Sequence, residues 1–164
     1  MRIEGTHVYP VPVDAVIAMF RDETATVARY ESMGHRDVKV VELDADDDTV
    51  RVVSTRVVDV DLPGFAKKAL KPTNTMTQTD EWHRQDDGSW SGTFGVDVQG
   101  APVRIDGTMQ LVPEANGARH TVNLDLQVKI PLIGGKIADW AGKNEGRKTL
   151  DAEFAFNAQR LGGG

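Results

Sequence analysis

The strongest constraint on the fold is the turn punctuation in the second half of the chain. Three dipeptides typical of tight β-hairpins occur there, namely Asp87-Gly88, Gln99-Gly100 and Asn116-Gly117. They separate four strand-like segments, which are residues 73–84, 89–98, 103–112 and 118–130. Because each hairpin joins neighbouring strands, the series predicts an antiparallel meander.

Three more strands are expected before this meander, at residues 2–9, 38–43 and 49–60. The first alternates polar and apolar residues and stops at Pro10, and the third is rich in β-branched residues. The turn between the second and third is acidic. We interpret it as a solvated hairpin tip, because its spacing lacks the glycine and distal glutamate of a calcium loop. Its acidic residues are Asp44, Asp46, Asp47 and Asp48.

Apolar residues at helical spacing predict two short helices after the first strand. Pro12 suits the first turn of a helix over residues 12–21, where its missing N–H has no helical partner in any case. Asp22 is expected to cap the second helix, and Gly34 marks its end. The expected apolar face of the second helix consists of Val27, Tyr30 and Met33.

The C-terminal segment predicts one long amphipathic helix over residues 135–160. Its apolar residues recur at steps of three and four, namely Ile137, Trp140, Ala141, Leu150, Phe154, Ala158 and Leu161. Gly142 and Gly146 weaken such a helix by about 1 kcal/mol each relative to alanine. We expect them to mark a bend or a close approach to the sheet. Residues 162–164 are all glycine and are expected to form a flexible tail.

The order of elements predicts an α+β fold rather than a doubly wound sheet. One strand, two short helices, six strands and a long helix suit a curved, seven-stranded antiparallel sheet that wraps around the final helix. A chain of 164 residues is near the common domain size, so we expect a single domain over residues 1–161.

Composition excludes several classes of function. The chain has no cysteine, which removes disulfides, thiolate metal sites and thiol nucleophiles. Its formal net charge of −6 disfavours nucleic acid as a partner, and no apolar run is long enough to span a bilayer. We expect a cytoplasmic protein. Two basic clusters are interpreted as solvated faces, namely Lys67, Lys68 and Lys71, and Lys143, Arg147 and Lys148.

Several local motifs, together with this order of elements, carry a resemblance to a known superfamily. They are residues 12–16 (PVDAV) with Met19 and Asp22, residues 61–63 (DLP), Gln78 with Glu81-Trp82, Gly100 with Pro102, and residues 131–137 (PLIGGKI). On these residues the chain resembles the START and birch-pollen-allergen-like superfamily, also called the polyketide cyclase/dehydrase and lipid-transport superfamily (SRPBCC). More narrowly, it is similar to an actinobacterial family of unknown function within that group.

The resemblance implies a helix-grip fold with a cavity between the sheet and the C-terminal helix. Relatives bind lipids, sterols, polyketides, quinones or plant hormones, and a minority catalyse reactions. The narrower family offers no catalytic residue that can be carried over to this chain, and no cofactor is implied.

A sheet curved around a helix encloses space that side chains or a ligand must fill. The candidate ligand-binding residues are large apolar ones, namely Met76, Trp82, Trp90, Phe94, Met109, Leu124, Trp140 and Phe154. Each of them also suits an ordinary core position. Phe65 is expected either at the mouth of the pocket or as a simple loop anchor.

The titratable residues give weaker signals. Histidines are scattered at positions 7, 35, 83 and 120, without metal-ligand spacing, although His7 and His120 become neighbours if the first and last strands pair. Asp80 shares a strand face with Trp82, and Glu81 shares the other with His83. We assign no catalytic residue and no metal ligand.

Three hypotheses follow from the sequence. The leading one is non-enzymatic binding or transport of a small hydrophobic molecule. The second is a cyclase- or aromatase-like enzyme, which predicts a buried polar pair inside the cavity. The third is a protein-interaction module, which predicts a filled cavity and an exposed apolar patch.

Overall fold

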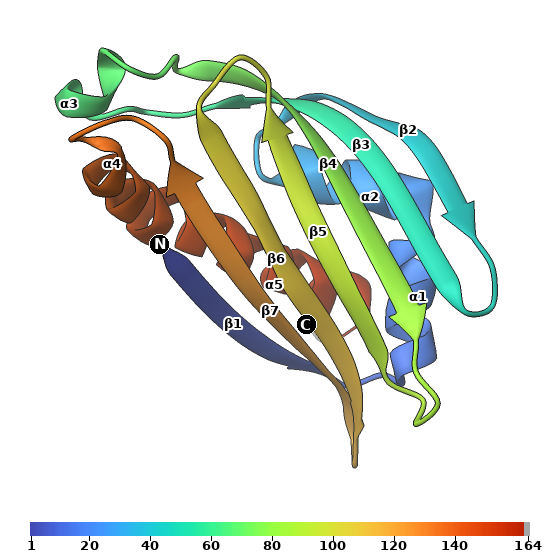
Figure 1. Cartoon of the computed structure of the whole chain (residues 1–164). Coiled ribbons are helices and arrows are strands. Elements are labelled where there is room, and N and C mark those ends of the chain that lie inside the picture. Colours follow the sequence, from blue (N-terminus) through green and yellow to red (C-terminus); the bar gives the residue numbers. More distant parts are fainter. Residues whose placement is uncertain (163–164) are drawn as a thin grey trace.

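The computed structural model describes residues 1–162, so Gly163 and Gly164 of the expected tail lie outside the described residues. A single seven-stranded antiparallel sheet forms the core, with the strand order β1-β7-β6-β5-β4-β3-β2. It curves strongly (Figure 1). The strands are β1 (Arg2–Tyr9), β2 (Arg36–Ala45), β3 (Thr49–Asp59), β4 (Thr73–Arg84), β5 (Trp90–Val98), β6 (Val103–Glu114) and β7 (Gly117–Val128).

All the longer helices lie on one face of this sheet, the inside of the curve (Figure 1). The helical segments are α1 (Val13–Phe20), α2 (Glu23–Ser32), α3 (Gly64–Lys67), α4 (Gly134–Ala141), the π-helical turn η1 (Gly142–Gly146) and α5 (Arg147–Arg160). None of the helices within residues 1–162 is both long and apolar enough to cross a bilayer. The predicted α+β, helix-grip arrangement is confirmed.

The predicted strands occur within a few residues of their expected limits, and residues 73–84 match β4 at both ends. The first and last strands pair, and His7 lies opposite His120 as expected. Residues 46–48 of the acidic segment form the β2–β3 turn, whereas Asp44 lies in β2. The Asp46 carboxylate accepts hydrogen bonds from the backbone N–H groups of Asp48 and Thr49, both at 2.8 Å. The turn chemistry of aspartate therefore accounts for this segment.

The helix α2 begins and ends where its sequence predicts. The Asp22 side chain accepts a hydrogen bond from the Thr24 N–H at 3.0 Å, which satisfies one of the free donors at the helix start. Gly34 ends the segment with a φ of 84°, a value that favours glycine. The expected apolar face is only partly right, because Thr26 and Arg29 are buried beside Tyr30.

The C-terminal helix is continuous but changes its winding at the two predicted glycines. Residues 142–146 form the π-helical turn η1 between α4 and α5. A Cβ atom on Gly146 would lie 2.6 Å from the Cδ1 atom of Ile3, and one on Gly142 would overlap Met1. The glycines therefore mark both an irregular turn and a close approach of the helix to β1.

Gly107 of β6 lies where the sheet leaves no room for a side chain. A Cβ atom there would overlap the carbonyl oxygen of Asn123 and lie 2.7 Å from the ring of Phe94. We predict that Gly107→Ala lowers the free energy of unfolding by about 1–3 kcal/mol, the usual cost of overpacking. Urea denaturation of both the wild type and the variant measures this change.

Gly95→Ala is the matched control, because Gly95 lies on the adjacent strand and has open space around its Cα atom. We expect it to change the unfolding free energy by less than about 0.5 kcal/mol. Equal effects of the two substitutions would contradict the close packing at Gly107.

Candidate functional site

A cavity of about 490 Å³ lies between the inner face of the sheet and the helices that cover it. Its walls come from β3 to β7, the second half of α2 and the inward side of α4, η1 and α5. This volume falls within the range of about 300–1,000 Å³ that is typical of small-molecule pockets.

Most of the side chains expected in a pocket lie in the cavity wall. The structure brings together six of the eight candidates, namely Met76, Trp82, Phe94, Met109, Leu124 and Trp140. They come from four strands and α4. Their neighbours in the wall include Val96, Val122 and Leu126, so most of the surface around the cavity is apolar.

Trp90 and Phe154 lie outside the cavity wall, contrary to expectation, and Phe65 also lies outside it, which fits its alternative as a loop anchor. Trp90 is the first residue of β5, and the guanidinium carbon of Arg21 lies 5.6 Å from the centroid of its ring. Phe154 faces β1 and β7, and its ring centroid lies 5.3 Å from that of His120. Phe65 joins a small separate cluster with Leu62, Ala66 and Ile137. These three side chains pack against neighbouring elements, Trp90 and Phe154 in the main core and Phe65 in the small cluster.

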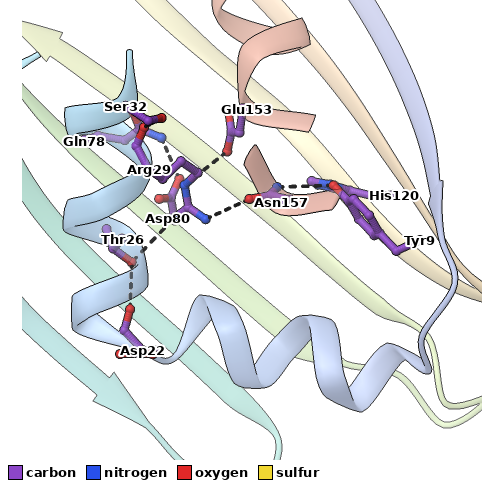
Figure 2. Close-up of polar contacts among 10 residues, drawn as sticks. All are labelled: Tyr9, Asp22, Thr26, Arg29, Ser32, Gln78, Asp80, His120, Glu153 and Asn157. Atoms are coloured by element: carbon purple, nitrogen blue, oxygen red, sulfur yellow. Dashed lines mark hydrogen bonds and ion pairs between the residues drawn. The ribbon is translucent and has the colours of Figure 1, made fainter. Parts of the chain in front are cut away.

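A buried chain of polar contacts crosses the molecule beside the cavity (Figure 2). Arg29 of α2 lies 3.8 Å from the Glu153 carboxylate and donates to the Asn157 side chain at 3.4 Å. Asn157 in turn donates to the Tyr9 hydroxyl at 3.2 Å, and that hydroxyl lies 3.0 Å from Nδ1 of His120. The chain thus connects α2, α5, β1 and β7.

Burial controls the protonation of this chain. It lowers the pKa of His120 to about 3, with a smaller contribution from the positive charge of Arg29. It also raises the pKa of Tyr9. Both groups are therefore neutral near pH 7, and the ring of His120 acts as a hydrogen-bonding group rather than as a charge.

Of the titratable residues considered in the sequence, the structure places Asp80, His35 and His120 in the cavity wall, and Asp80 is the one carboxylate among them. Its carboxylate accepts a hydrogen bond from Gln78 at 2.9 Å (Figure 2). Burial raises the pKa of Asp80 to about 6, although Gln78 and the nearby arginines favour its charged form. A carboxyl group with such a pKa can exchange a proton near neutral pH.

The second arginine of the cavity, Arg56 of β3, is missing from the sequence-based candidates. Only 5% of the residue is exposed. Its guanidinium carbon lies 4.1 Å from the ring centroid of Tyr30. His35 also stacks on Tyr30, with its ring centroid 6.0 Å from that of Tyr30. Burial, with help from Arg56, lowers the pKa of His35 to about 4.

A sequence signal for Arg56 exists in the alternation of β3. Val50, Val52 and Val58 are buried on the inner face, and Ser54 and Arg56 occupy the same parity. Since side chains alternate between faces along a strand, Arg56 had to point inward. Arg29 gave no comparable signal, because one helical turn of α2 carries both polar and apolar buried residues.

Comparison with known proteins identifies related sequences. Residues 4–161 match the family model described as "Protein of unknown function (DUF2505)". The uncharacterized protein Rv0481c of Mycobacterium tuberculosis is 32% identical over 95 residues, which cover 56% of this chain and 55% of the relative. The match spans about half the length of such curated relatives.

Solved structures share the fold at low sequence identity. TTHA0849 of Thermus thermophilus has a TM-score of 0.69 at 17% identity, with 98% of this chain and 97% of that chain covered. A STAR-related lipid transfer protein of Xanthomonas axonopodis has a TM-score of 0.56 at 16% identity, with 95% of this chain and 85% of that chain covered. Ara h 8.0201 has a TM-score of 0.57 at 11% identity, with 100% of this chain and 99% of that chain covered. These likenesses bear on the fold alone, which is the helix-grip arrangement of sheet and C-terminal helix.

The raised pKa of Asp80 predicts a pH-dependent stability. The folded state holds the Asp80 proton more tightly than the unfolded state does, so the free energy of unfolding falls as the pH rises from about 4 to about 6. The quantity of interest is the free energy of unfolding of Asp80→Asn minus that of the wild type. We expect this difference to be about 1–3 kcal/mol more favourable to the variant at pH 8 than at pH 4. Urea denaturation at the two pH values measures this gain.

Asp97→Asn, at an exposed position of the neighbouring strand β5, is the control and is not expected to reproduce the gain. An Asp80→Asn variant whose stability relative to the wild type is the same at both pH values would contradict the raised pKa.

Proposed function

The chain belongs to the DUF2505 family, and from this premise we propose that it binds or carries a small hydrophobic ligand in its cavity without catalysing a reaction. The observation that carries the proposal is the cavity of about 490 Å³ with its mainly apolar wall. Protein interiors are normally close-packed, so an apolar space of this size is an unusual feature to maintain without an occupant.

The shared fold supports the same proposal. One structural neighbour is described as a STAR-related lipid transfer protein, and we extend that kind of ligand to this chain as part of the proposal. The proposed contacts are the six apolar candidates in the wall, namely Met76, Trp82, Phe94, Met109, Leu124 and Trp140. Methionine and aromatic side chains adapt to ligands of varied shape.

The interaction-module hypothesis fits less well. It predicted a filled cavity, whereas the space here is large. The large apolar side chains that are exposed among residues 1–162 are Val8 of β1, Val41 and Leu43 of β2, Val112 of β6 and Leu132 before α4. Single exposed apolar residues of this kind are ordinary in folded proteins.

A cyclase-like enzyme is the second candidate, because one observation favours it. Asp80 and Gln78 form a hydrogen-bonded polar pair in the cavity wall, as that hypothesis predicted. A carboxyl group whose pKa is about 6 suits proton transfer near neutral pH. Turnover of a poly-β-keto thioester that Asp80→Asn abolishes would favour this candidate over the carrier.

The proposal treats residues 1–161 as a single domain acting in the cytoplasm. A cysteine-free chain suits a reducing compartment. The partner is the small molecule itself, and the proposal requires no nucleic acid, no metal and no cofactor.

A panel of uncharged hydrophobic compounds tests the proposal directly. It includes 1-decanol, a sterol and a polycyclic aromatic compound. Trp82 and Trp140 lie in the cavity wall, so we expect at least one compound to change the tryptophan fluorescence in a saturable manner. Calorimetry confirms the stoichiometry, and silence across the whole panel would contradict the proposal.

Leu124→Trp provides a variant in which the larger side chain occupies the cavity. We expect it to weaken binding of the active compound by about tenfold or more, because ligand and side chain compete for the same space. Val112→Trp adds the same side chain at an exposed position of β6 and is expected to bind as the wild type does.

A further inference from the structure

Arg56 is a buried charged group without a partner. It lies on the inner face of β3 in the cavity wall, and its Nε and Nη1 atoms are buried with no hydrogen-bond acceptor among residues 1–162. Asp80 lies near enough to interact with the charge of Arg56, but a buried N–H donor that lacks an acceptor is still destabilising. The arrangement therefore points to an acceptor that belongs to something else.

The surroundings of Arg56 hold it in place without satisfying it. Tyr30 contacts the guanidinium through its ring, with the ring centroid 4.1 Å from Cζ. Such stacking uses the face of the group and leaves the N–H edge free. His35 also lines the cavity, and its Nδ1 atom is buried without a partner in the described chain.

The other charges near Arg56 are already engaged. Glu153 of α5 forms its ion pair with Arg29 of α2, at 3.8 Å. Asp80 of β4 accepts its hydrogen bond from Gln78, at 2.9 Å (Figure 2). Neither carboxylate hydrogen-bonds to Arg56, so its Nε and Nη1 N–H groups have no acceptor among residues 1–162.

We propose that the cavity takes an amphipathic carboxylic acid, whose carboxylate binds the N–H groups of Arg56 while its apolar body lies along the wall formed by Phe94, Met109 and Leu124. The inference rests on the proposed function and names its ligand class. The guanidinium fork matches a carboxylate in a bidentate geometry. A monoanion fits better than a phosphate dianion, because Asp80 and Glu153 face the same cavity and repel added negative charge.

Decanoate and 1-decanol are the matched probes, because they share a ten-carbon body and differ in the charged group. Calorimetry at pH 7.5 gives both dissociation constants, and their ratio defines the carboxylate preference of each protein variant. We expect Arg56→Met to lower this preference by about tenfold or more, the effect of a lost charge-assisted hydrogen bond. Its affinity for 1-decanol should stay within about twofold of the wild-type value.

Two further variants keep the test decisive. Arg56→Lys keeps the charge but loses the fork, and we expect it to lose part of the preference for decanoate. This variant also serves if Arg56→Met does not fold. Arg104→Met removes an exposed arginine of β6 and is expected to retain the wild-type preference.

Each outcome decides between the two claims. A preference that survives both Arg56 substitutions overturns the inference, while binding of 1-decanol leaves the proposed function in place. If other uncharged compounds bind but decanoate and 1-decanol do not, the inference about the carboxylate is overturned and the proposed function remains. If neither these probes nor any compound of the uncharged panel binds, both claims fail.

Discussion

The close contact between the C-terminal helix and β1 determines the rest of the structure. Both the helix and β1 carry glycines at this contact, and each glycine leaves room for a side chain from the opposite side. Gly142 and Gly146 of the helix lie against Met1 and Ile3, and a Cβ atom on Gly5 of β1 would lie 2.7 Å from Leu150. The helix therefore lies low at one edge of the sheet. Because the sheet curves away from that edge (Figure 1), the space over its middle strands is not filled by the same helix.

The opposite side of this space is covered by α2, and here the chain places its charges. Arg29 bridges α2 to α5 through Glu153 and Asn157, which connects the two helices that cover the cavity. Arg56 comes from the sheet below and finds no acceptor among the residues described. The cavity thus has an apolar wall and a charged region that holds Arg29, Arg56, Asp80 and Glu153. This polarity along the cavity makes an amphipathic occupant more complementary than a purely apolar one.

The sequence predicted the fold well because its signals were local. Turn dipeptides such as Asp87-Gly88 set the strand limits, and Asp22 set the start of α2. It predicted the site less well, because local patterns do not say which buried side chains face an empty space. Trp90 and Met109 are both buried, yet only Met109 lies in the cavity wall. Arg56 was detectable from strand parity alone, but its lack of a partner depends on β4, α2 and α5 together.

A crystal structure determined under xenon pressure shows whether the cavity exists, since xenon binds in apolar cavities. We expect ordered xenon between the inner face of the sheet and α5, in contact with side chains such as Phe94 and Leu124. An interior in which side chains fill this volume and no xenon binds would contradict this expectation, and only the topology of the sheet and helices would then remain.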